Sequence, residues 1–233
     1  MSHIYLDNIS LDYPIYGANR KSFKKSLINT VGGVFKEDLS SMTISVLKNI
    51  SFKFNLGDRY VIYGKNGAGK TTLLRVLSQV LSPTSGKIDI SGKVASLLDI
   101  TLGMESDSTG YENIISRGIL MGHSLSNIQK IVDDVVEFTD LGNFINLPLH
   151  TYSSGMKMRL GFAVSTALPA DIIIMDEWLS VGDEAFQIKA ENRLKKFISK
   201  DTILIVASHD KTLAKNLNAK SLFMQEGKLI THR

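Results

Sequence analysis

Two kinds of hydrophobic pattern alternate along the chain. Strand-like runs, alternating or continuously apolar, occupy residues 4–13, 45–54, 59–63, 87–90, 94–98, 171–176, 202–207, 221–225 and 228–232. Apolar residues at helical spacing occupy residues 71–81, 110–121, 124–138, 154–168, 183–199 and 211–217. Strands and helices alternate on both sides of a helical stretch at about 101–168. The pattern therefore predicts an α/β fold with a mostly parallel sheet, covered on both faces, and a helical insertion.

Two local features refine this prediction. The turn Asn55-Leu56-Gly57-Asp58 separates the runs 45–54 and 59–63 and predicts a hairpin there. Residues 20–35 combine apolar positions at helical spacing with a basic start, made by Arg20, Lys21, Lys24 and Lys25. They predict a short amphipathic helix, which either docks on its own domain or contacts a membrane surface or membrane partner.

Composition and charge narrow the class of protein. The chain has 233 residues, of which 43% are hydrophobic and 21% charged, as in ordinary globular domains. It contains no cysteine, which excludes disulfides, thiolate catalysis and cysteine zinc sites. The net charge of +4 equals that of the four basic residues at 20–25, so the rest of the chain is balanced and we expect no nucleic-acid partner. The start lacks the features of a signal peptide, and no apolar run approaches membrane-spanning length. A role at a membrane would therefore require a partner that spans it.

A phosphate-binding motif follows the run 59–63. The stretch from Gly64 to Thr71 fits G-x-x-x-x-G-K-[ST] between a predicted strand and a predicted helix. Glycines allow backbone N–H groups to wrap closely around phosphate oxygens, Lys70 would reach the β- and γ-phosphates, and Thr71 would offer its hydroxyl to Mg²⁺. The predicted nucleotide-binding residues here are Gly64, Asn66, Gly67, Ala68, Gly69, Lys70, Thr71 and Thr72. The alternative is a glycine-rich turn that contains a lysine by chance.

A pair of carboxylates ends the buried run 171–176. Asp176 and Glu177 stand where a central strand of an open α/β sheet meets its active site. Asp176 would hold Mg²⁺ directly or through water, and Glu177 would polarise an attacking water as a general base. Without a phosphate loop, the same pair would read equally well as a solvated strand end.

Further motifs extend over essentially the whole chain and carry a family resemblance. Residues 152–160, Tyr-Ser-Ser-Gly-Met-Lys-Met-Arg-Leu, resemble the signature motif of ATP-binding cassette (ABC) ATPases, and Ser208-His209-Asp210 resembles their switch histidine. Ser180-Val181-Gly182-Asp183 is similar to the loop after the catalytic glutamate. Tyr13 is similar to the aromatic residue that stacks on adenine, with Tyr16 as a substitute.

The resemblance implies a fold, a domain division and roles for residues. It implies the P-loop NTPase fold of ABC ATPases, with an antiparallel β lobe beside the mostly parallel core sheet. The single nucleotide-binding domain would span 1–233, with the catalytic core and β lobe at about 1–100 and 169–233 and a helical subdomain at about 101–168. ATP and Mg²⁺ are the implied cofactors, Glu177 and His209 the implied catalytic residues. Ser153, Ser154 and Gly155 would contact the γ-phosphate bound to a second copy of the chain, in a homodimer.

Details of the motifs indicate a subgroup. Ser154 and Met156 replace the usual Gly and Gln of the signature motif, and Asp99 lies at or beside the usual glutamine switch, where it is a further candidate metal ligand. The signature sequence, the stretch 176–183 and the basic insertion before the phosphate loop resemble ATPases of polysaccharide exporters. The resemblance implies export of a lipid-linked polysaccharide such as O antigen. This chain would lie at the cytoplasmic face of the bacterial inner membrane, bound to two copies of a polytopic transmembrane permease.

Three alternatives remain open at this point. The exported polymer is O antigen in the first hypothesis and capsular polysaccharide or teichoic acid in its closest rival. A soluble ABC-type ATPase of translation or DNA repair usually fuses two cassettes or inserts a long coiled coil, and neither pattern occurs here. A small-molecule phosphotransferase would leave the signature motif without a purpose.

Overall fold

The computed structural model describes residues 1–15, 35–38, 41–177 and 184–230. The chain divides into two compact units, residues 1–91 with 203–233 and residues 92–202. The predicted division at about 101–168 stays a prediction.

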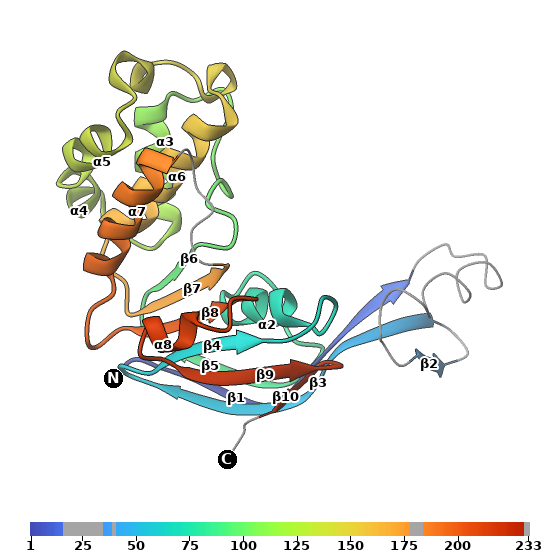
Figure 1. The fold of residues 1–233 in the computed structure, drawn as a ribbon. Helices are drawn as coiled ribbons and strands as arrows, with labels where there is room; N and C mark the ends of the chain where they lie inside the picture. Colours follow the sequence, from blue (N-terminus) through green and yellow to red (C-terminus); the bar gives the residue numbers. More distant parts are fainter. Residues whose placement is uncertain (16–34, 39–40, 178–183, 231–233) are drawn as a thin grey trace. The chain divides into compact units, whose positions relative to one another are not determined.

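An antiparallel sheet forms one part of the first unit. Its strands are β1 (His3–Ile15), β2 (Phe35–Asp38), β3 (Ser41–Asn55) and β5 (Ser85–Ser91), in the order β2-β3-β1-β5 (Figure 1). In β1, Leu6 and Ile9 are both fully buried although they lie three residues apart. A β-bulge between them, with Asn8 at φ 54°, restores the alternation of buried and exposed side chains.

Parallel strands form the other part of the first unit. β4 (Arg59–Tyr63) pairs in parallel with β8 (Ile203–Ala207) and with β9 (Lys220–Gln225), and β10 (Lys228–Ile230) pairs antiparallel with β9. All five residues of β8 are buried, as expected for a strand covered on both faces. Among the described residues of this unit, the helices are α2 (Lys70–Leu77) and α8 (Leu213–Asn216).

The predicted hairpin between residues 45–54 and 59–63 is wrong. β3 pairs with β1 and β2, whereas β4 pairs with β8 and β9, so the chain changes sheets at the turn. The turn itself is as predicted, because the Asp58 carboxylate accepts a hydrogen bond from Asn55 N–H at 2.8 Å and Gly57 has φ 79°. These local interactions are the same whether the two flanking strands pair with each other or belong to different sheets. The buried centre of β4, residues 60–62, requires cover on both faces, which the parallel arrangement provides.

The second unit combines two parallel strands with helices. β6 (Val94–Ser96) pairs with β7 (Ile172–Asp176). The helices are α3 (Gly110–Leu120), α4 (Leu125–Gln129), α5 (Val132–Thr139), α6 (Ser154–Ala167) and α7 (Glu184–Phe197), with 3₁₀ turns η1 (Gly142–Asn146) and η2 (Leu149–Thr151) (Figure 1). Thr109 and Glu112 close a reciprocal capping box that starts α3.

Three predicted helices are shorter than expected. The helix predicted at 211–217 forms only as α8, at residues 213–216. The pattern at 124–138 predicts one helix, but the chain forms α4 and α5 with a break at residues 130–131. The pattern at 71–81 runs past the end of α2 at Leu77, because Gln79 adopts the left-handed conformation with φ 60°. Apolar spacing alone therefore overestimates helix length where the backbone turns inside an apolar run.

The predicted amphipathic helix lies outside the described residues except for its last residue, Phe35, which begins β2. In the part of the chain that the structure describes, no helix combines the length and the apolar character needed to cross a membrane.

Candidate functional site

The predicted site residues fall into two sets, one in each unit. The first unit holds Tyr13, the phosphate-loop residues 64–72 and His209, and the second holds Asp99, residues 153–155, Asp176 and Glu177. Tyr16 and the loop 180–183 lie outside the described residues.

Three glycines shape the phosphate loop between β4 and α2, each for its own reason. A Cβ atom at Gly64 would lie 2.5 Å from the backbone oxygen of Met224, so only glycine fits. Gly67 has φ +77° with open space around it, so the left-handed backbone alone favours glycine there. Gly69 combines φ +101° with a Cβ position 3.1 Å from the oxygen of Val46. The loop is thus a cradle of bare backbone at the N-terminus of a helix, which suits an anion.

Lys70 brings a positive charge into this cradle. Its side chain is 8% exposed, and Nζ donates to the backbone oxygens of Gly64 at 2.7 Å and Lys65 at 3.3 Å. Both acceptors belong to the loop, so the side chain folds back along it. Thr71 and Thr72 lie in the first turn of α2, which contains no acidic residue. The positive charge of Lys70 and the backbone N–H groups of the loop are therefore suited to binding a polyphosphate.

A cleft of about 670 Å³ lies beside the loop. Its walls are loop residues 64–68 and, on the C-terminal hairpin β9–β10, Phe223, Met224, Gln225, Glu226 and Ile230. Gly227 N–H donates to Ala68 O at 3.1 Å and so joins the hairpin to the loop. Sequence reasoning missed this wall, because no motif marks the hairpin and the contact is remote in sequence. Tyr13 does not line this cleft as the described residues form it; it lies in β1 opposite Ile44, about one-third exposed.

The switch motif follows β8, which runs parallel to β4. Parallel strands bring their carboxyl ends to one edge, so the motif and the phosphate loop leave the sheet on the same side. Ser208 N–H donates to Ile62 O at 3.1 Å, next to the loop. The Asp210 carboxylate accepts hydrogen bonds from Thr212 N–H and from its hydroxyl, both at 2.8 Å, which lower the pKa of Asp210. This turn holds the exposed His209 at the end of the strand.

In the second unit, β7 ends at the predicted carboxylate pair. Residues 172–175 are buried, Asp176 is half-buried, and Glu177 is exposed with φ 68°. A left-handed backbone is unfavourable for glutamate by about 1–2 kcal/mol, and such strain concentrates at functional positions. Leu97 N–H donates to Ile174 O at 2.8 Å. This hydrogen bond keeps the segment after β6 alongside β7, near the end of β7 that carries Asp176.

Asp99 follows that segment, and its carboxylate stabilises a local turn. Its Oδ1 accepts hydrogen bonds from Thr101 N–H at 3.2 Å and from the Thr101 hydroxyl at 2.9 Å. Over the described ranges, no cluster of three His, Asp or Glu side chains could hold a metal ion by itself. Mg²⁺ commonly takes one or two carboxylates and completes its shell with phosphate oxygens and water. The role of Asp99 as a metal ligand stays a prediction.

The signature motif begins α6, as predicted. Ser153 is the N-cap, and its Oγ accepts the N–H of Met156 at 3.2 Å. Ser154 and Gly155 form the first turn and are accessible. Tyr152 is buried and its hydroxyl donates to Phe144 O at 2.5 Å, which anchors the motif to η1. The motif therefore presents a polar helix N-terminus to the outside of its unit.

Comparison with known proteins agrees with these motifs. The ABC transporter family model matches residues 47–180. The O-antigen export system ATP-binding protein RfbE of Yersinia enterocolitica is 38% identical over 229 residues, which cover 97% of this chain and 96% of that protein. The teichoic acids export ATP-binding protein TagH of Bacillus cereus is 34% identical over 97% of this chain, but this chain spans only 40% of that protein.

A solved structure supports the fold. The dimeric structure of a post-hydrolysis state of the ATP-binding cassette MJ0796, bound to ADP and Pi, superposes with a TM-score of 0.69 at 19% identity over 99% of both chains. The predicted α/β fold class is confirmed. The family match covers more than half of the chain and the identity to RfbE extends over nearly all of it. The chain belongs to the ATP-binding subunits of the ABC transporter family.

Proposed function

We propose that this chain is the ATP-binding and ATP-hydrolysing subunit of a transporter that exports a lipid-linked polysaccharide such as O antigen. The observation that carries this proposal is the phosphate cradle at Gly64, Gly67 and Gly69 with Lys70 folded along it. The near full-length similarity to an O-antigen export system ATP-binding protein supports polysaccharide export as the process.

Each site residue then has a role. The backbone N–H groups of the phosphate loop and the Lys70 ammonium bind the β- and γ-phosphates, and Tyr13 stacks on adenine. Thr71 and Asp176 would hold Mg²⁺, with Asp99 as a further candidate ligand, and the ion would supply positive charge to neutralise the phosphates. Glu177 accepts a proton from the attacking water, and His209 orients that water toward the γ-phosphate.

Assembly completes the mechanism. Two copies of the chain sandwich ATP, so that Ser153 and the amide groups near Gly155 reach the γ-phosphate held by the other copy. The homodimer lies at the cytoplasmic face of the bacterial inner membrane, where its closing and reopening drive two copies of a polytopic transmembrane permease. The accessible helix N-terminus at Ser153 supports this role.

Teichoic acid is the second candidate substrate. The similarity to TagH over nearly the whole of this chain favours it, although TagH extends well beyond the matched part. The two candidates share the nucleotide chemistry and differ in the glycan.

Export in a strain that lacks RfbE tests the proposal. Expression of this chain with its own permease in Yersinia enterocolitica without RfbE should restore O antigen at the cell surface, measured by gel analysis of lipopolysaccharide. The Lys70→Ala variant at equal expression is the control and should restore none. Absence of O antigen with the wild-type chain, together with restored teichoic acid in Bacillus cereus without TagH, would replace O antigen by teichoic acid. Failure in both strains would contradict the proposed export function.

A further inference from the structure

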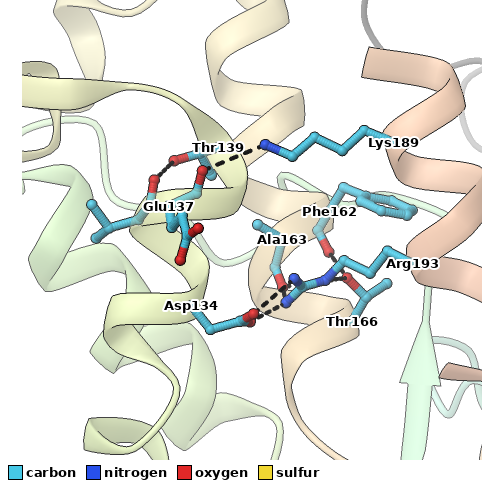
Figure 2. Close-up of polar contacts among 9 residues, drawn as sticks. Asp134, Glu137, Thr139, Phe162, Ala163, Thr166, Lys189 and Arg193 are labelled. Carbon is cyan, nitrogen blue, oxygen red and sulfur yellow. Dashed lines mark hydrogen bonds and ion pairs between the residues drawn. The ribbon is translucent and has the colours of Figure 1, made fainter. Parts of the chain in front are cut away.

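One arginine joins three helices of the second unit. Arg193 of α7 forms an ion pair with Asp134 of α5, with Nη2 at 2.5 Å and Nη1 at 3.2 Å from the two carboxylate oxygens (Figure 2). Its Nε donates to the Thr166 hydroxyl of α6 at 2.8 Å, and Nη2 also reaches Ala163 O at 3.4 Å. The Arg193 side chain is 14% exposed and that of Asp134 is 57% exposed, so the contacts with α6 are partly buried while the ion pair lies at the surface. We call Arg193, Asp134, Thr166 and Phe138 the Arg193 clamp.

Aromatic rings reinforce the same three helices. Phe138 of α5, Phe162 of α6 and Phe186 of α7 contact one another with ring centroids 5.4–6.3 Å apart. The Arg193 guanidinium stacks over the Phe138 ring at 4.3 Å, and Lys189 Nζ lies 5.0 Å from the centroid of the same ring. Figure 2 shows Lys189 also reaching the backbone oxygen of Glu137, at 3.5 Å. The planar guanidinium thus pairs at its edge and stacks on its face, which lysine cannot do.

The position of the clamp links it to the chemistry. Ser153, the signature serine, is the N-cap of α6, and the clamp holds α6 near its other end, at residues 163–166. A 14-residue helix is about 21 Å long and is a rigid element through which a restraint at one end can affect the other. α7 is the first described helix after Glu177. Fixing α6 against α5 and α7 therefore fixes the direction in which Ser153 points.

We propose that Arg193 is a positioning residue for ATP hydrolysis: through the clamp it orients the signature end of α6 without touching nucleotide. The proposal rests on the proposed function, in which Ser153 contacts ATP held by the other copy. Loss of the clamp should therefore impair closure of the ATP-bound dimer and turnover. It should leave first binding of nucleotide unchanged, because the phosphate loop belongs to the other unit of the chain.

Three variants test the clamp. Arg193→Lys keeps the charge but loses the planar fork, Asp134→Asn removes the paired carboxylate, and Lys195→Gln is the matched control. Lys195 lies on the same helix and forms an exposed ion pair with Glu191 at 2.8 Å. Each purified full-length variant is measured for melting temperature, for equilibrium binding of a fluorescent ATP analogue and for kcat. ATP-dependent dimer formation is measured by light scattering in the Glu177→Gln background.

We expect Arg193→Lys to lower kcat at least ten-fold and reduce the dimer fraction, with affinity for the analogue within two-fold of wild type. Asp134→Asn should act in the same direction, and the double variant should be little worse than the worse single variant, because both changes break one clamp. Lys195→Gln should match wild type.

The possible contrary results separate the two proposals. Wild-type kcat and dimer formation in folded Arg193→Lys would overturn the positioning role. The positioning role would also be overturned if both clamp variants lost kcat and analogue binding equally and showed a large drop in melting temperature. That pattern would indicate general destabilisation. Absence of hydrolysis and dimer formation in the wild-type protein would instead contradict the proposed function itself.

Discussion

The substitution Gly67→Ala isolates one physical requirement of the phosphate loop. A Cβ atom at Gly67 meets no other atom within 4 Å, so steric overlap plays no part. The backbone has φ +77°, where an L-residue with a side chain is less favourable than glycine by about 1–2 kcal/mol. Gly67 is exposed, and the turn is closed by the hydrogen bond from Ala68 N–H to Lys65 O. The free protein can therefore relax this turn at little cost.

Binding of ATP must then restore the strained turn, so the cost appears in affinity. A free-energy cost of about 1–2 kcal/mol corresponds to a dissociation constant raised about 5-fold to 30-fold. Isothermal titration calorimetry with ATP and Mg²⁺ measures this constant, with the Glu177→Gln background preventing hydrolysis. The melting temperature without nucleotide should change little.

Gly122→Ala is the matched control. Gly122 has φ +81°, is exposed and also has open space around its Cβ position, but it lies after α3, away from the phosphate loop. Because Gly122 is as exposed and as open as Gly67, its turn can relax in the same way, so Gly122→Ala should change the melting temperature little and leave ATP affinity unchanged. Wild-type ATP affinity in Gly67→Ala would contradict this prediction, because binding would then not need the left-handed turn.

Three further predictions concern charge. Lys70→Ala should abolish measurable ATP hydrolysis in a phosphate-release assay, since the loop loses its cation; wild-type turnover would place the site elsewhere. Glu177→Gln should accumulate an ATP-bound dimer detectable by size-exclusion chromatography, and a purely monomeric variant at saturating ATP and Mg²⁺ would count against the shared site. Burial and the charge of Lys93 lower the pKa of His123 below 6.5, so the unfolded chain binds more protons there and stability falls as pH drops below about 6.5. His123→Gln should remove this loss in thermal melts at about pH 5.5 and 7.5, whereas His150→Gln, at an exposed histidine, should retain it; equal slopes in both variants would disprove the assignment.

The phosphate loop could be predicted from sequence because its requirements are local. Backbone curvature and a helix start demand glycines and a lysine at fixed spacing, and the structure places Gly64, Gly67, Gly69 and Lys70 accordingly. The start of α6 was also predicted, since the pattern places a helix from residue 154 and the structure makes Ser153 its N-cap. Motifs of this kind encode their own geometry.

Features set by remote contacts could not be predicted. The turn at Asn55–Asp58 has the same local chemistry in a hairpin as in a change of sheets, and only the partners of β4 decide between them. The hairpin wall beside the phosphate loop depends on the contact of Gly227 with Ala68. Likewise, nothing in the pattern of α7 marks Arg193 as the residue that reaches Asp134, since that pair is 59 positions apart in sequence.

Affinity capture from membranes tests the central claim most directly. Tagged chain is isolated from detergent-solubilised membranes of its own organism, and the proteins that copurify are identified by mass spectrometry. We expect recovery of a polytopic membrane protein, together with ATP hydrolysis that Lys70→Ala removes from the purified complex. Recovery of ribosomes or DNA-repair factors without any integral membrane protein would contradict the transport function.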